Sequence, residues 1–270
     1  LPARDLWYSE GHINYYYGGQ YFAVFLTKLS HTKVELTYNL MRTFVAGLAF
    51  AMPFSLVYQM MSDRMKGLQK SEKVIKGLPF AAGFTAGTAV SIAGNMHYVI
   101  YAQIIPLIEK LTGKEVSSYW FPDATRYIGY NPYREEDRTI HEFPCYSFVL
   151  GDLHAHVVNI MFVLLVIALL YVWLRGVRKK TVPVETSMKD GKFWKEQLLM
   201  PHLLVISALL GMFQWTNFWD FVIYYVVTLG TVLFANIIRF QGKIKKIMVV
   251  TFAQMAEIYL LAYLVILPFT

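Results

Sequence analysis

Cysteine and charge are both scarce in this chain of 270 residues. The single cysteine, Cys145, excludes a disulfide bond within the chain. Charged residues make up only 16% of the composition and hydrophobic residues 56%, whereas soluble domains are about one quarter charged. The apolar residues also come in runs of roughly twenty, which is long enough to cross a bilayer. The sequence therefore predicts an all-α, multi-pass transmembrane helical bundle whose principal partner is the lipid bilayer.

Several other features are missing, and each absence narrows the function. No internal repeat, low-complexity segment or soluble domain is apparent. The net charge is +7, but the cations lie in short loops between apolar runs. That distribution is typical of topology signals, so no nucleic-acid partner is expected. The chain begins at Leu1 without a methionine or a cleavable signal pattern and ends in an apolar run, so we expect a fragment of a longer protein with a membrane helix before Leu1.

We expect one transmembrane domain over the whole chain. Its parts are an external loop with an interfacial helix, membrane helices, a long external loop and further membrane helices, at residues 1–35, 36–110, 111–147 and 148–270. The predicted spans are 36–61, 77–94, 148–173, 201–216, 221–238 and 248–268. Every cationic cluster then falls on the cytoplasmic side, provided that the helix at 13–29 lies on the membrane surface.

Polar residues collect at the external face in this topology. The densest group is the segment HEFPCYSFVLGDLHAH, residues 141–156, which leads directly into an apolar run. Its ionisable residues include Glu142, Asp152, His154 and His156. Ionisable side chains cost about 3 kcal/mol each at the bilayer centre on insertion scales, so they usually mark a function or a paired polar site. This segment is therefore the first candidate for a functional site.

Two interpretations of GDLHAH remain open. On a continuous helix Asp152 and His156 share a face, and His154 points away from it. If Gly151 breaks the helix, Asp152, His154 and His156 would converge on one divalent metal, with Glu142 as a further ligand. Imidazole with carboxylate suits Zn or Mn, and carboxylates alone suit Mg. The alternative is an Asp–His hydrogen-bonded pair that caps the helix without a metal.

Further candidates lie at the ends of the spans and within one of them. Arg126 is an external cation suited to a phosphate, and Glu257 is an acid inside the last span, as a proton-coupled transporter requires. Tyrosines 15–17 are typical of interface anchoring, with headgroup or sugar binding as the alternative. The polar turn at 217–220 would otherwise only satisfy its own backbone. The candidates for substrate binding are His12, Tyr15, Tyr16, Asn95, Arg126, Asn217, Trp219 and Asp220.

Three sequence blocks, in the right order, resemble one family of membrane proteins. DLWYSEGHINYYYGGQY resembles the tyrosine-triplet signature of the "YYY" polytopic membrane proteins, a family of unknown function from bacteria and archaea. EFPCYSFVLGDLHAH resembles that family's EFPFFSFLLGDLHAH-like block, and TNFWDFVIYY its NTWDFPTY-like block. Cys145 stands where an aromatic residue is common, and Val222 with Ile223 replaces the usual Pro–Thr. Neither departure affects a charged residue.

The YYY family is similar in fold to the GT-C membrane glycosyltransferases, which use polyprenyl-phosphate-linked sugars. The resemblance implies a GT-C-like bundle that transfers such a sugar at the external face of the cell membrane. It also implies that Asp5, in the first external loop, is a catalytic base or a metal ligand. We expect Asp5 to be the base, and we expect Asp152, with a divalent metal, to act at the donor phosphate. The alternatives are a multi-pass transporter with a polar site around Glu257 and a non-catalytic membrane protein.

Overall fold

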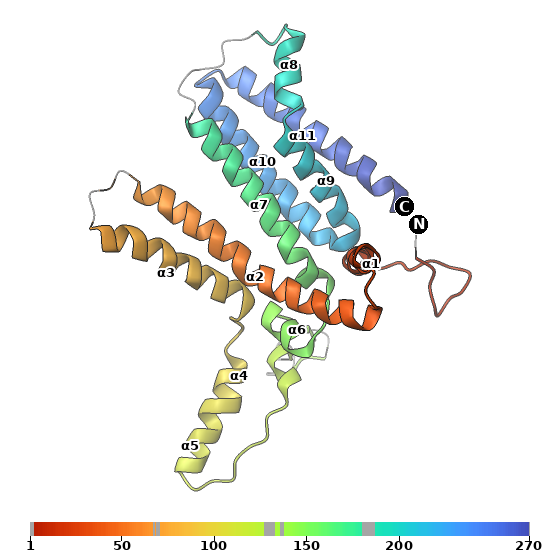
Figure 1. The fold of residues 1–270 in the computed structure, drawn as a ribbon, viewed down its shortest axis with the longest axis vertical. Coiled ribbons are helices and arrows are strands. Elements are labelled where there is room, and N and C mark those ends of the chain that lie inside the picture. Colours follow the sequence, from red (N-terminus) through yellow and green to blue (C-terminus); the bar gives the residue numbers. More distant parts are fainter. Residues whose placement is uncertain are drawn as a thin grey trace. The chain divides into compact units, whose positions relative to one another are not determined.

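The computed structural model describes residues 3–66, 68, 71–126, 133–135, 138–179 and 187–269. Nearly all the regular structure in these residues is helical, and the β pairing among them is an isolated bridge between Arg4 and His12. The chain divides into two compact units (Figure 1). The first comprises Leu1–Tyr38 and Ala155–Thr270, and the second comprises Asn39–His154.

The first unit is a helical bundle. α9 packs against α7, α10 and α11, and α10 also packs against α7 and α11 (Figure 1). Almost fully buried core side chains lie between these helices, among them Leu170, Ile206, Leu210, Phe213 and Ile258. The elements of the unit are α1 (Gly18–Ser30), α7 (Ala155–Lys179), α8 (Gly191–Leu198), α9 (Pro201–Thr216), α10 (Phe218–Phe240), α11 (Ile244–Ile266) and η3 (Leu267–Phe269). In a bilayer such helices are held mainly by close van der Waals packing.

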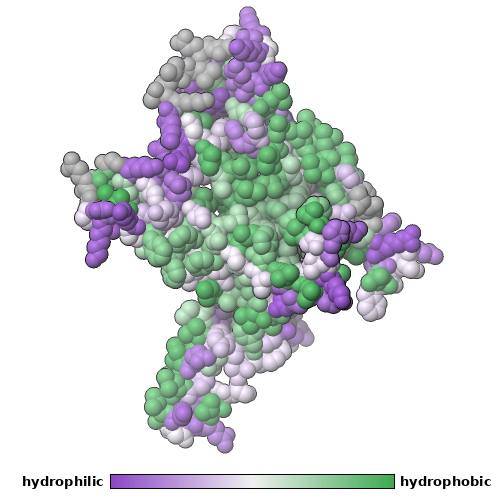
Figure 2. All heavy atoms as spheres, in the orientation of Figure 1, coloured by the Kyte–Doolittle hydropathy of each residue, from purple (hydrophilic) through white to green (hydrophobic). Residues whose placement is uncertain are grey.

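Several helices are long and apolar enough to cross a membrane. They are α2 (Val34–Met65), α7, α10 and the segment Ile244–Phe269, and the pair of α8 and α9, bent by 51°, is a fifth candidate. Outward-facing residues on α10 and α11 are apolar: Val226 is 60% exposed and Phe252 77% exposed. Figure 2 shows hydrophobic side chains gathered over the bundle and hydrophilic ones near α8. The predicted all-α, multi-pass membrane class is therefore confirmed.

Two predicted helices differ from the observed ones. α1 begins at Gly18 rather than at residue 13, because Gly18 and Gly19 lie directly against Trp215, Thr216 and Val158 of the bundle. α3 (Glu72–Ser91) forms near the predicted span 77–94, but it is not among the helices apolar enough to cross a bilayer. Its first turns carry Glu72, Lys73 and Lys76, which shorten the apolar run. The surface location of α1 stays a prediction.

The second unit contains most of α2, all of α3 and a series of short helices. Gly83 and Gly87 allow α3 to approach α2 closely, since a Cβ at either position would meet a backbone carbonyl oxygen at 2.8–2.9 Å. The short elements are α4 (His97–Val99), the π-helix η1 (Ile100–Ile104), α5 (Ile105–Leu111), η2 (Phe121–Thr125) and α6 (Pro144–Leu150). The predicted span 148–173 is interrupted, because α6 ends at Leu150 and α7 begins at Ala155.

Candidate functional site

Gly151 breaks the helix in the middle of GDLHAH. It follows α6 with a left-handed φ of 75°, and the amides of Gly151 and Asp152 both donate to the carbonyl of Ser147, at 2.8 and 2.9 Å. A Cβ at Gly151 would overlap the guanidinium of Arg42, so both the backbone conformation and the contact require glycine. The break leaves Asp152 and His154 in non-helical backbone, as the metal-binding interpretation of the sequence requires.

The imidazole of His154 lies between two carboxylates. Its Nδ1 donates to Oδ2 of Asp152 at 2.5 Å and lies 3.2 Å from Oε2 of Glu142. The hydrogen bond to Asp152 raises the pKa of His154, the negative charges of Glu142 and Asp152 add to this, and partial burial opposes it. The side chains of the three residues are 22–45% exposed, so ions and water can reach them.

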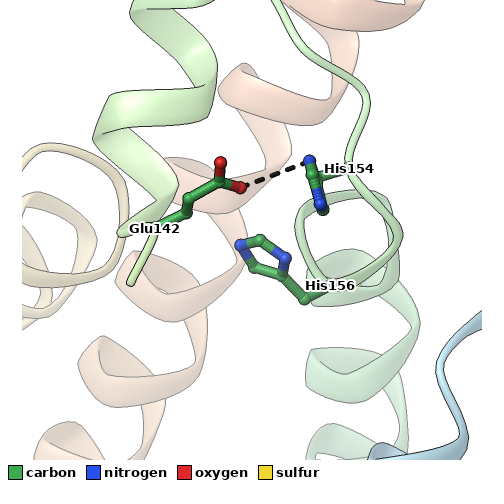
Figure 3. A group of neighbouring side chains, drawn as sticks. All are labelled: Glu142, His154 and His156. Carbon is green, nitrogen blue, oxygen red and sulfur yellow. Dashed lines mark ion pairs between the residues drawn. The ribbon is translucent and has the colours of Figure 1, made fainter. Parts of the chain in front are cut away.

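The group that suits a cation best consists of Glu142, His154 and His156. One ligand atom from each lies within 4.8 Å of the others, and Figure 3 shows all three side chains turned toward one another. Ligand atoms sharing one tetrahedral Zn²⁺ at 2.0–2.2 Å stand about 3.4 Å apart, so small side-chain rotations would close the site. The donor set of one carboxylate and two imidazoles suits Zn or Mn better than Mg.

Asp152 lies beside the imidazole of His154 and is hydrogen-bonded to it. Its Oδ2 is taken up by the hydrogen bond from His154. A carboxylate bound to one ring nitrogen fixes the orientation of the imidazole and increases its basicity toward a metal at the other nitrogen. Asp152 is therefore positioned to orient His154, and its direct ligation of a cation stays a prediction.

Arg42 is a residue of this site that the sequence does not single out. Its guanidinium lies against Gly151, and its Nη1 donates to Oδ1 of Asn39 at 3.1 Å. Its Nε is buried and has no hydrogen-bond partner within the described part of the chain. An arginine near the start of a long helix gives no sequence signal of a site; only the fold brings it beside the GDLHAH segment. Arg42 adds a cation against Gly151, the residue before Asp152.

Asp220 and Asn217 are joined to each other and to α7 in the first unit. Oδ2 of Asp220 accepts hydrogen bonds from Asn159 at 2.6 Å and from Asn217 at 2.9 Å. Thr216 donates to the other end of the Asn159 amide at 3.0 Å, and Asn159 and Thr216 are 1% and 2% exposed. Asn159 is three residues after His156, so this network holds the helical turn that carries His156.

Asp5 and His12 lie in the N-terminal loop of the first unit. Oδ1 of Asp5 accepts hydrogen bonds from the amides of Trp7 at 2.8 Å and Tyr8 at 3.3 Å, which makes a local turn of the kind aspartate favours. His12 is exposed and pairs with Arg4 in the isolated bridge. The structure thus orders the Asp5 carboxylate through one oxygen.

The remaining predicted residues are aromatic side chains of the first unit and polar side chains of the second unit. Tyr15 and Trp219 are 66% and 68% exposed, and the ring of Tyr16 lies 5.3 Å from that of Tyr15. Asn95 donates to the carbonyl of Ala124 at 2.6 Å, so it ties the loop before α4 to η2 in the second unit. Arg126 lies over Trp120 at 4.5 Å, and its Nη1 is buried without a hydrogen-bond partner in the described residues.

The fold and the site together define a multi-pass α-helical membrane protein with a carboxylate–imidazole group at the start of a membrane helix. One protein family, described as "Uncharacterized membrane protein (DUF2298)", matches residues 1–270, and the chain belongs to that family. A comparison with curated proteins and another with solved structures found no match. The family confirms the membrane class, while the resemblance to the YYY and GT-C proteins stays a prediction.

Proposed function

We propose that the protein transfers a sugar from a polyprenyl-phosphate-linked donor at the external face of the cell membrane, as the GT-C glycosyltransferases do. The observation that supports this most is the convergence of Glu142, His154 and His156 at the start of α7. A cation site at the end of a membrane helix suits a substrate whose phosphate lies at the membrane surface and whose chain lies in the lipid.

The charged side chains would act on the donor phosphate in two ways, through a bound cation and through direct hydrogen bonds. Glu142, His154 and His156 would hold the divalent cation, which supplies Lewis-acid neutralisation of phosphate charge when bound. Arg42 has an unused N–H next to Gly151, and guanidinium groups bind phosphate oxygens with strong, charge-assisted hydrogen bonds. Arg126, the phosphate ligand suggested by the sequence, keeps the same role in the proposal, since its Nη1 also lacks a partner among described residues.

The proposed transfer is a displacement at the anomeric carbon of the sugar. The hydroxyl oxygen of the acceptor forms a bond to that carbon as the bond from the carbon to the phosphate oxygen breaks. The phosphate oxygen keeps the bonding electron pair, and the hydroxyl proton passes to the carboxylate of Asp5. Because the turn at Trp7 and Tyr8 uses only Oδ1 of Asp5, Oδ2 is available for the proton.

The other predicted residues would bind the sugar and the acceptor. The exposed rings of Tyr15 and Trp219, and the partly buried ring of Tyr16, present apolar faces of the kind on which sugar rings stack. His12, Asn95, Asn217 and Asp220 supply polar groups. Of these, Asn95 and Asp220 already form hydrogen bonds within the protein. Replacing either residue would therefore lower activity mainly by changing the shape of the site.

Sugar transfer from radiolabelled polyprenyl-phosphate donors tests this proposal. Membranes carrying the full-length protein would be assayed as wild type, Asp5→Asn and His154→Ala, with Glu72→Gln as the control because Glu72 is an exposed acid on α3. We expect transfer in the wild type and the control and a loss of at least about 100-fold in the other two, as for the removal of an acid–base group. Equal activity in all four proteins would refute both catalytic assignments.

One observation favours a second function, that of a transporter. Oε2 of Glu257, within α11, is buried and has no hydrogen-bond partner in the described part of the chain. Acids inside membrane helices frequently carry protons or bind ions. Uptake of candidate solutes into proteoliposomes at an imposed pH gradient would test this: proton-coupled uptake should stop in Glu257→Gln, and uptake that persists in that variant would exclude coupling through Glu257.

A further inference from the structure

A second polar site lies at the other end of α7, within the first unit. It is a pocket of about 630 Å³ between the ends of α7 and α10 and the junction of α8 with α9. Trp173, one of its lining residues, is seventeen positions after His156, which is roughly 25 Å along a helix that rises 1.5 Å per residue. The pocket is therefore separate from the carboxylate–imidazole group and independent of the proposed sugar transfer.

Arg239 places a positive charge in this pocket, and its guanidinium is hydrogen-bonded to neutral side chains. Its Nη2 donates to Oε1 of Gln197 at 2.5 Å, and its Nη1 donates to Oδ1 of Asn236 at 3.2 Å. Among the described residues Arg239 forms no ion pair. Glu196 also lines the pocket, but it is exposed and does not pair with Arg239. A half-buried guanidinium is usually matched by an anion, and no carboxylate of the described residues lies within ion-pair distance of Arg239.

Buried amides fix the guanidinium in place from behind. Asn236 donates to Gln254 at 2.8 Å and to Thr251 at 3.0 Å, and Gln254 donates to the carbonyl of Gln197 at 3.0 Å. Asn236 and Gln254 are 0% exposed and Gln197 is 1% exposed. A fully satisfied polar network of this kind is rigid, so Arg239 is held ready for a ligand rather than free to turn into water.

His202 offers a second donor in the same pocket. Its Nε2 is buried without a hydrogen-bond partner among the described residues, and its ring packs on Trp173 at 5.0 Å. His202 follows Pro201 in the first turn of α9, where backbone amides have no partner inside the helix and anions are favoured. Two side chains with N–H groups, from α9 and α10, therefore line the same pocket.

The rest of the pocket wall is apolar. Leu169 and Val172 contribute from α7, Ile238 from α10, and Leu199 and Met200 from the α8–α9 junction. Val172 and Leu199 are 64% and 55% exposed, and both lie on or beside helices that are candidate membrane spans. A ligand with an anionic head and an apolar chain would fill such a pocket, whereas a free anion would leave the apolar wall uncovered.

We propose that this pocket binds an anionic phospholipid, with the phosphate on Arg239 and His202 and an acyl chain along Leu169 and Val172. The same end of the bundle carries Arg178, in the last turn of α7, and Lys243, between α10 and α11, and the positive-inside pattern predicts this end to be cytoplasmic. Such basic surroundings attract anionic lipids, and basic pockets between membrane helices bind their headgroups.

Quenching of Trp173 by brominated lipids tests the proposal. The purified full chain would be placed in phosphatidylcholine nanodiscs containing either brominated phosphatidylglycerol or brominated phosphatidylcholine, and the Trp173 signal would be identified by its loss in Trp173→Phe. We expect quenching at lower mole fraction for the anionic lipid. Arg239→Gln should weaken this preference about tenfold, the effect of losing one charge-assisted hydrogen bond. Arg178→Gln, which removes an exposed cation at the same end, should keep it.

A second variant and a competition complete the test. Val172→Phe fills the pocket without touching the Arg239 network, so it should also reduce the preference even if Arg239→Gln is unstable. Equal losses in Arg239→Gln and Arg178→Gln would show that general surface charge attracts the lipid, which would overturn the proposal. So would displacement of the lipid by excess inorganic phosphate, since the ligand would then be a free anion, and so would equal quenching by the two lipids in the wild type.

Discussion

The guanidinium of Arg42 rests directly against the backbone of Gly151, at the point where the chain turns into the GDLHAH segment. The contact depends on the missing side chain, because a Cβ there would occupy the space of the Arg42 head group. It also couples α2 to the loop that carries Asp152 and His154. Gly151 thus both ends α6 and provides the contact with Arg42.

Replacement of Gly151 by alanine should therefore damage the site more than a positive φ alone would. We expect Gly151→Ala to lower the melting temperature and to weaken divalent-metal binding. The left-handed backbone should cost about 1–3 kcal/mol in the free energy of unfolding, and displacement of Arg42 should add to that cost. Gly113→Ala is the matched control, since Gly113 has a φ of 70° but nothing within 4 Å of its added Cβ. Equal destabilisation in the two variants would mean that the Arg42 contact contributes nothing.

The pairing of His154 with Asp152 predicts a pH dependence of stability. The pKa of His154 is raised above its ordinary value of 6.5, mainly by the hydrogen bond to Asp152. Because the pKa of His154 is higher in the folded protein than in the unfolded chain, protonation of His154 stabilises the fold. This stabilisation is complete at a pH below the unfolded pKa and is lost as the pH rises through the folded pKa. The metal-free wild type should therefore exceed Asp152→Asn in melting temperature by more at pH 5.5 than at pH 9. A difference that is the same at both pH values would contradict this reading of the pair.

The hydrogen bonds of Asn159 predict a stability effect in the first unit. Asn159→Ala removes the partner of Thr216 and one of the two donors to Asp220. We expect a loss of about 1–2 kcal/mol in the free energy of unfolding, because two hydrogen bonds are lost but Thr216 keeps its bond to Met212 and Asp220 its bond from Asn217. Ser207→Ala is the control, because the Ser207 hydroxyl donates to the carbonyl of Leu203 in its own helix and to no other group of the described residues. Thermal unfolding in detergent would measure both variants, and equal losses would argue against the network.

The membrane class of this chain could be predicted from sequence because it depends on local composition. Long apolar runs produce long helices wherever their backbone groups must be satisfied within lipid, and α7, α10 and α11 follow from that alone. The charged start of α3 and the left-handed Gly151 modify the pattern through single residues. The apolar segment 148–150 therefore belongs to α6 instead of to the following span.

The site was predictable only in part. The carboxylates and imidazoles of residues 142–156 lie close in sequence, so their convergence needed only the break at Gly151. Arg42 and the pairing of Asn159 with Asp220 depend on contacts between helices far apart in the chain. Residue type carries no information on such contacts: Arg42 is an ordinary helix residue by sequence, and Asp220 is an ordinary residue of a polar turn.

Metal binding tests the central claim most directly. The purified full chain would be titrated with Mn²⁺ and Zn²⁺ by calorimetry, and the Mn²⁺ complex examined by electron spin echo spectroscopy for coupling to imidazole nitrogen. We predict one strong site with imidazole nitrogen coupling, which Glu142→Gln, His154→Ala and His156→Ala each weaken at least about tenfold. His31→Asn, at an exposed histidine with left-handed backbone that asparagine tolerates, should leave the site unchanged. Binding without imidazole coupling, or binding unaffected by loss of both His154 and His156, would contradict the account.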